Sequence, residues 1–207
     1  MEEAVRIPCG DIELEGRWSP GSGPALAAVV CHPHPLMGGD MHSPPVTWVR
    51  GTLVRRGVAV LRFNFRGAGL SGGTHGGGID EVQDVEAALR FVAGRAPRAR
   101  LVLVGYSFGA LVAARTAANR SDLYALGLIA PPLATSELPP LAADAFPGGL
   151  VVVAGDKDEF CPAAGLRAWT ERAGAQLELL PGEDHFLAGA EDDMTRIFAS
   201  WLAPEAA

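Results

Sequence analysis

The chain has 207 residues, of which 48% are hydrophobic and 20% charged, and its formal net charge at pH 7 is −7. This length and composition predict one globular domain over residues 1–207, large enough to bury a substantial core. The 17 basic residues are scattered among 24 acidic ones and form no basic face, so we expect no nucleic-acid partner.

The N-terminus and the cysteines indicate where the protein works. Residues 1–6 lack the basic and apolar regions of a signal peptide, and no apolar run approaches the roughly 20 residues that span a bilayer. We therefore expect a cytoplasmic protein with no membrane partner. The odd number and wide spacing of Cys9, Cys31 and Cys161 argue against a disulfide framework.

The first part of the chain predicts a hairpin and then a strand, a helix and a strand. Residues 4–8 and 12–18 alternate between polar and apolar side chains, as expected of two short strands. Continuous apolar runs at 25–31 and 58–63 predict strands covered on both faces. Between these two runs, residues 46–56 show helical spacing.

A glycine-rich loop and a strong helix follow. Residues 66–78 have no fixed period, so they predict turns rather than a repeat. Residues 79–94 place apolar side chains on one face at i, i+3 and i+4 spacing. Asp80, Glu81 and Asp84 stand in the early turns of this helix, where acidic side chains suit the helix dipole.

The rest of the chain alternates regularly between strands and helices. The predicted strands are residues 101–104, 123–129, 150–154 and 176–180, and the predicted helices are residues 107–119, 163–173 and 192–202. Such alternation predicts an α/β fold: a mostly parallel sheet, preceded by an antiparallel hairpin, with helices on both faces.

A serine lies in the segment Gly105-Tyr106-Ser107-Phe108-Gly109, between a predicted strand and a predicted helix. So tight a reversal forces Ser107 into an unfavourable backbone region and leaves room only for glycine two residues away on either side. The hydroxyl then lies at a helix N-terminus, whose N–H groups favour developing negative charge. The alternative interpretation is a glycine-rich turn with an incidental capping serine.

A serine nucleophile needs a base, and the base needs an orienting group. His185 follows the last predicted strand, and Asp156 and Asp158 follow the strand before it. In a parallel sheet these positions lie at the same edge as Ser107. The order of serine, acid and histidine is the order found in α/β hydrolases.

The chain resembles the α/β-hydrolase superfamily over nearly its whole length. The segments HPHPLMGG at residues 32–39 and RFNFRGAGLS at residues 62–71 resemble the small bacterial serine hydrolases of the dienelactone-hydrolase-like kind. Dienelactone hydrolase itself has cysteine where Ser107 stands. The resemblance implies a single-domain fold, and it selects Asp158 over Asp156 because Gly155-x-x-Asp158 matches the acid loop of the family.

The resemblance also implies an oxyanion hole made of two backbone N–H groups. Phe108 is expected to supply one of them. The other belongs to the loop after the third strand, where Pro33 and Pro35 have no N–H to donate. His34 is therefore the predicted second donor, with Leu36 as the fallback.

The walls of the substrate pocket are predicted only from loop positions. The expected wall residues are Leu36, Met37, Tyr106, Leu133 and Phe160. Many relatives insert a helical lid after the strand that is residues 123–129 here. The stretch 130–149 is too short for one, so we expect an open cleft.

Four residues invite a metal interpretation: Cys31, His32, His34 and His42. Cysteine and histidine do bind zinc, but no second Cys/His pair follows at ligand spacing, so we expect no metal site. The side chain of His32 is expected instead to hydrogen-bond the backbone of neighbouring loops.

The predicted function is that of a carboxylesterase that acts on small or short-acyl esters. It would use a Ser107–His185–Asp158 triad and an acyl-enzyme intermediate, and this chemistry needs no cofactor. The predicted partner is therefore a small-molecule ester. Two alternatives stay open: an amidase or peptidase with the same triad, and a non-catalytic binding module. No residue pattern predicts an oligomeric state.

Overall fold

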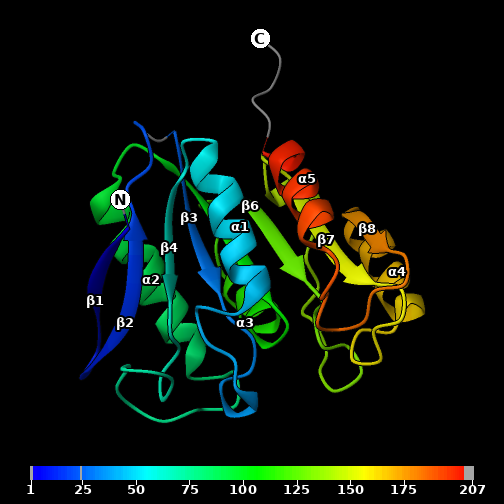
Figure 1. Cartoon of the computed structure of the whole chain (residues 1–207), viewed down its shortest axis with the longest axis horizontal. Helices are drawn as coiled ribbons and strands as arrows, with labels where there is room; N and C mark the ends of the chain where they lie inside the picture. Colours follow the sequence, from blue (N-terminus) through cyan, green and yellow to red (C-terminus); the bar gives the residue numbers. More distant parts are fainter. Residues whose placement is uncertain (1, 24, 203–207) are drawn as a thin grey trace.

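The computed structural model describes residues 2–23 and 25–202, so residues 1, 24 and 203–207 of the predicted domain lie outside the described residues. The described chain contains an eight-stranded sheet with the order β1-β2-β4-β3-β5-β6-β7-β8 (Figure 1). Its strands are β1 Glu3–Cys9, β2 Ile12–Ser19, β3 Leu26–Cys31, β4 Ala59–Phe63, β5 Arg100–Tyr106, β6 Leu123–Ile129, β7 Leu150–Gly155 and β8 Gln176–Leu180.

The sheet has the predicted α/β organisation. The strand β2 pairs antiparallel with both β1 and β4, and every other pair of neighbours is parallel. All residues of β4 and β7 are buried, as expected of parallel strands covered on both faces. The N-terminal hairpin and the mostly parallel sheet are therefore confirmed.

Helices cover both faces of the sheet. They are α1 Pro44–Arg55, α2 Glu81–Arg95, α3 Phe108–Ala117, α4 Ala163–Ala173 and α5 Glu191–Trp201, with short 3-10 turns η1 at Pro35–Met37 and η2 at Ala143–Ala145. The helices α1 and α5 lie side by side on the face that is in front in Figure 1, where Val49 and Phe198 join one core cluster. The other helices pack on the opposite face, where Val85, Val112 and Leu166 join the second cluster.

The start of α2 differs from the prediction. Ile79 was expected on the buried face of the helix, but it lies before the first turn and is 74% exposed. Glu81 and Asp84 were assigned to the helix dipole, yet both side chains are fully buried and accept hydrogen bonds from neighbouring loops. The glycine-rich loop before α2 folds back onto these carboxylates, and this delays the start of the helix.

The connection between β6 and β7 bears on access to the site. Within the described residues it contains only the short turn η2, so no lid domain is inserted there. None of the helices in residues 2–23 and 25–202 combines the length and the apolar character that crossing a membrane requires.

The parallel strands end together at the lower edge of the sheet in Figure 1. From β3 the chain continues to β4 on one side, whereas β5 lies on the other side of β3. In open α/β sheets, such a switch point opens a crevice beyond the carboxyl ends of the strands. The loops after β3, β5, β6, β7 and β8 meet there.

Candidate active site

The turn at Ser107, the predicted nucleophile, has the geometry that its glycines predict. Ser107 lies between β5 and α3 with φ 54° and ψ −117°, a backbone conformation that non-glycine residues rarely adopt. A Cβ atom on Gly105 would overlap the carbonyl of Gly109, and one on Gly109 would lie 2.6 Å from the Cys31 carbonyl oxygen. The N–H of Ser107 donates to the Ile129 carbonyl at 2.8 Å, which ties the turn to β6.

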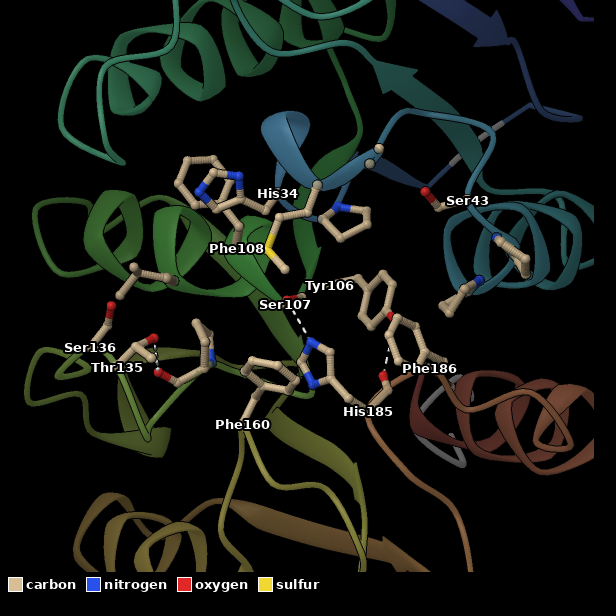
Figure 2. Close-up of a pocket in the computed structure, with 18 of the residues that line it drawn as sticks. His34, Ser43, Tyr106, Ser107, Phe108, Thr135, Ser136, Phe160, His185 and Phe186 are labelled. Carbon is tan, nitrogen blue, oxygen red and sulfur yellow. Dashed lines mark hydrogen bonds between the residues drawn. The ribbon is translucent and has the colours of Figure 1, made fainter.

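Three side chains form a hydrogen-bonded line at the edge of the sheet. Ser107 Oγ lies 2.8 Å from His185 Nε2 (Figure 2). On the other side of the ring, His185 Nδ1 lies 2.8 Å from Asp158 Oδ2. The other oxygen of Asp158 accepts from the N–H groups of Phe160 at 2.8 Å and Cys161 at 2.9 Å. An ionised carboxylate can only accept, so Nδ1 of His185 carries the proton and Nε2 is free to accept from Ser107.

The structure separates the two candidate acids. Asp158 is 4% exposed and contacts His185 directly. Asp156 instead accepts a hydrogen bond from the N–H of Gly182 at 2.7 Å, which joins the loop after β7 to the loop after β8. Only Asp158 is therefore placed to orient the imidazole.

The loop that carries His185 is held from two sides. The Tyr106 hydroxyl donates to the His185 carbonyl at 2.9 Å. Burial raises the pKa of Tyr106 and the Asp158 carboxylate raises it further, so the hydroxyl remains a donor at neutral pH. Leu187 is fully buried at a φ of 54°, which anchors the loop just beyond the histidine. The sequence placed Tyr106 at the cleft wall but did not reveal this hydrogen bond.

His32 has the structural role that was predicted, and this role is confirmed. Its Nδ1 donates to the Pro33 carbonyl at 2.6 Å, and its Nε2 accepts from the Phe65 N–H at 2.9 Å. Burial lowers the pKa of His32 to about 4, so the ring is neutral at pH 7, as this pattern of one donor and one acceptor requires. In residues 2–23 and 25–202, no group of three or more His, Cys, Asp or Glu side chains is arranged to hold a metal ion.

The cysteines are placed as core residues rather than nucleophiles. Cys9, Cys31 and Cys161 are buried free thiols. Burial raises the pKa of Cys31, and burial with the nearby Asp158 raises that of Cys161 to about 12. A thiol reacts as its thiolate, so Ser107 is the better-placed nucleophile near the histidine.

The loop after β3 lies against the start of α3, where the oxyanion hole is predicted. Burial lowers the pKa of His34, and its neutral Nδ1 accepts from the Leu36 N–H at 3.3 Å. That contact engages the N–H of Leu36, the fallback donor. Within the described residues, the N–H groups of His34 and Phe108 make no hydrogen bond. These two groups therefore stay available as donors.

A cleft of about 760 Å³ opens over Ser107 and His185, a size typical of small-molecule sites. Met37, Tyr106 and Phe160 line it as predicted. Leu36 and Leu133 do not line it: Leu36 is 72% exposed, and Leu133 packs against the core.

Other wall residues were missed by sequence reasoning. They come from the start of α1, from α3, and from the loops after β6 and β8: Pro44, Pro45, Trp48, Leu111, Pro132, Thr135, Ser136 and Phe186. In Figure 2 the hydroxyls of Ser43 and of Thr135 and Ser136 lie at opposite ends of the cleft, with Ser107 between them. The proline pair that starts α1 was a usable signal, because it ends the loop after β3 close to the nucleophile.

The fold and this arrangement are those of an α/β hydrolase, and known proteins agree. Residues 27–148 match the profile of the family described as serine aminopeptidase, S33. An uncharacterized protein from Rickettsia prowazekii is 32% identical over 201 residues, which is 91% of this chain and 84% of that protein.

Solved structures give the same result. An α/β serine hydrolase homologue from Coxiella burnetii is 28% identical, with a TM-score of 0.83 over 97% of each chain. A lidless α/β serine hydrolase from Xanthomonas campestris is 28% identical, with a TM-score of 0.86 over 100% of this chain and 97% of that one. The chain therefore belongs to the α/β-hydrolase superfamily and, within it, to the S33 serine aminopeptidase family.

Proposed function

We propose that this serine hydrolase is a carboxylesterase for small, uncharged esters. The observation that carries the proposal is the hydrogen-bonded line from Ser107 through His185 to Asp158, which opens into an apolar cleft. A scaffold without catalytic activity has no need of a serine held at a positive φ within 2.8 Å of an oriented imidazole. The geometry therefore favours an enzyme over a binding module.

In the proposed reaction, Ser107 Oγ attacks the ester carbonyl carbon and its proton passes to His185 Nε2. The N–H groups of Phe108 and His34 stabilise the negative charge on the carbonyl oxygen. The bond to the leaving alcohol then breaks as His185 returns the proton to the alcohol oxygen. Water next attacks the acyl-serine carbonyl while His185 accepts its proton, and the proton then returns to Ser107 as the acid leaves. Asp158 stabilises the imidazolium in both acylation and deacylation.

The cleft wall favours an ester over the substrate of an aminopeptidase. An aminopeptidase must bind a free α-ammonium group, and burying an unpaired ammonium is strongly unfavourable. No Asp or Glu lines the cleft among the described residues; the lining is mostly proline, aromatic and aliphatic side chains. A neutral ester carries no charge, so its binding needs no acidic side chain in the cleft.

Labelling with a fluorophosphonate tests the nucleophile directly. We expect the wild type to be labelled covalently and the Ser107→Ala variant not to be labelled, because only an activated serine attacks the phosphorus. Ser200→Ala is the matched control: this hydroxyl lies on α5 and bonds the Ile197 carbonyl, away from the cleft, so labelling should match the wild type. Folded wild-type protein that takes up no label would end the hydrolase proposal.

The size and charge of the substrate can be tested with a chromogenic panel. We expect kcat/KM for p-nitrophenyl butyrate to exceed that for the palmitate ester by about tenfold or more, because an open cleft without a lid leaves a long chain in water. Leucine p-nitroanilide, which carries a free α-ammonium, should not turn over. A preference for palmitate would contradict the short-acyl assignment, and fast cleavage of the anilide would favour a peptidase.

A further inference from the structure

A fully buried carboxylate lies beside the cleft and has no part in the proposed reaction. Glu81, the first residue of α2, has a side chain that is 0% exposed. Its Oε1 accepts from the N–H of Gly76 and its Oε2 from the N–H of Gly78, both at 2.7 Å. Burying a carboxylate is unfavourable unless hydrogen bonds replace the water that it loses. These two bonds therefore hold the glycine loop firmly onto Glu81.

The same carboxylate contacts a histidine. Nδ1 of His75 lies 2.9 Å from Oε1 of Glu81, although the ring N–H is not aligned for a hydrogen bond. The contact is therefore a close packing contact. It fixes one edge of the His75 ring, whose side chain is only 14% exposed.

The His75 ring completes a cluster of three rings. Its centroid lies 4.7 Å from the ring of His34 and 5.2 Å from the ring of Phe108, and those two rings are 5.0 Å apart. These are ordinary packing distances for aromatic pairs. Figure 2 shows the rings of His34 and Phe108 together at the cleft.

A second anchor presses the glycine loop onto this cluster. Arg115 of α3 donates to the Gly78 carbonyl at 3.0 Å. A Cβ atom on Gly78, whose φ is 84°, would lie 3.3 Å from the Phe108 ring, so there is little room for a side chain between this backbone and that ring. The loop, Glu81 and α3 thus form one packed unit behind Phe108.

We infer that His75, held by Glu81, is a positioning residue that sets the spacing of the oxyanion hole. The inference rests on the proposed function, because His34 and Phe108 are the two residues assigned to that hole. The N–H of Phe108 is fixed by α3. The His34 loop is held by its own turn bonds and by the His32 side chain, which binds the Pro33 carbonyl and the Phe65 N–H rather than α3. The His75 ring touches both residues and so couples the loop to the helix.

The positioning role depends on the ring of His75, which packs against His34 and Phe108, and not on its charge. Removal of the ring by His75→Ala should let the His34 loop shift and should lower kcat by about 10- to 100-fold, since loss of one oxyanion donor costs ~10²–10³ and small misplacements cost ~10². KM should change by less than about threefold, because the ground-state ester does not depend on the hole.

The experiment compares His75→Ala, His75→Asn, His75→Phe and Glu81→Gln with the wild type. For each we measure kcat and KM on p-nitrophenyl butyrate and the inhibition constant of a trifluoromethyl ketone, which adds to serine as a tetrahedral oxyanion. His75→Asn should behave as His75→Ala, whereas His75→Phe should restore kcat to within about threefold of the wild type. Glu81→Gln loses one acceptor for the N–H groups of the glycine loop. It should therefore lower kcat and weaken the binding of the ketone to a similar extent.

Leu166→Ala on α4 serves as the stability control, because this buried side chain belongs to a helix that packs against β7 and β8, whereas the ring cluster lies on the loop after β3, the loop before α2 and the start of α3. It should lower the melting temperature without changing kcat or ketone affinity. Wild-type kcat and ketone affinity in His75→Ala, or a loss in His75→Phe as large as in His75→Ala, would overturn the positioning role. A wild type without esterase activity would instead overturn the proposed function and this inference together.

Discussion

Asp158→Asn is expected to lower kcat/KM for p-nitrophenyl butyrate by about 10⁴-fold with little change in the fold. The N–H groups of Phe160 and Cys161 both donate to Oδ1 of Asp158, so the carbonyl oxygen of the asparagine must take that position. Its NH₂ group then faces His185 Nδ1, which has to accept. The proton of the ring moves to Nε2, and the imidazole can no longer accept the proton of Ser107.

Asp156→Asn is the matched control, since it makes the same chemical change two residues away. Among the described residues, the Asp156 carboxylate accepts one hydrogen bond, from the Gly182 N–H, and the asparagine oxygen can still accept it. We expect kcat/KM to stay within about threefold of the wild type, as for a surface substitution away from the chemistry. Steady-state kinetics on both variants decide the matter: equal losses, or the larger loss in Asp156→Asn, would contradict the assignment of Asp158.

The regular elements were predictable because their signals are local. The bounds of β6, α4 and β8 coincide with the predicted segments, since each apolar run is closed by polar, proline or glycine residues. The nucleophile turn was equally visible. Gly105 is required for a steric reason that acts within five residues, because its Cβ would overlap the Gly109 carbonyl. Gly109 is required instead by its contact with the Cys31 carbonyl of β3, which the local pattern does not show.

The walls of the cleft were harder to predict, because a loop side chain faces whichever neighbour the fold supplies. Leu133 and Pro132 are adjacent, yet Leu133 packs into the core and Pro132 lines the cleft. Trp48 and Phe186 belong to α1 and to the loop after β8, which are far apart in sequence. These two residues line one cavity because the loops at the carboxyl ends of the strands meet at the switch point of the sheet.

The acidic residues of α2 show the same limit for charged groups. A local rule assigned Glu81 and Asp84 to the helix dipole, which accounts for an exposed acid at a helix start. In the structure Asp84 accepts from the backbone N–H of Arg66 at 2.9 Å and from its guanidinium at 2.8 Å. Both acids therefore organise the glycine-rich loop. The sequence could not reveal this because the donors from the loop backbone, the N–H groups of Arg66, Gly76 and Gly78, leave no trace in the residue pattern.

Gly105→Ala is expected to abolish fluorophosphonate labelling and to lower the free energy of unfolding. The new Cβ atom would overlap the Gly109 carbonyl, which belongs to the first turn of α3 and cannot rotate away as a flexible side chain could. The chain must then either open the turn at Ser107 or shift α3 on the sheet. We expect destabilisation of about 3 kcal/mol or more, which for a domain of this size lowers the melting temperature by roughly 6–12 °C.

Gly94→Ala gives the opposite result if the steric explanation is right, because this glycine lies inside α2 with no atom within 4 Å of the added Cβ. Alanine loses less conformational entropy in a helix than glycine does, so this variant should be more stable by about 0.5–1 kcal/mol and should label as the wild type does. Thermal melts and labelling of the two variants, side by side, separate steric overlap at the turn from a general intolerance of glycine replacement. A folded Gly105→Ala protein that still labels would mean that the turn tolerates a side chain and that Ser107 reaches its reactive position by another route.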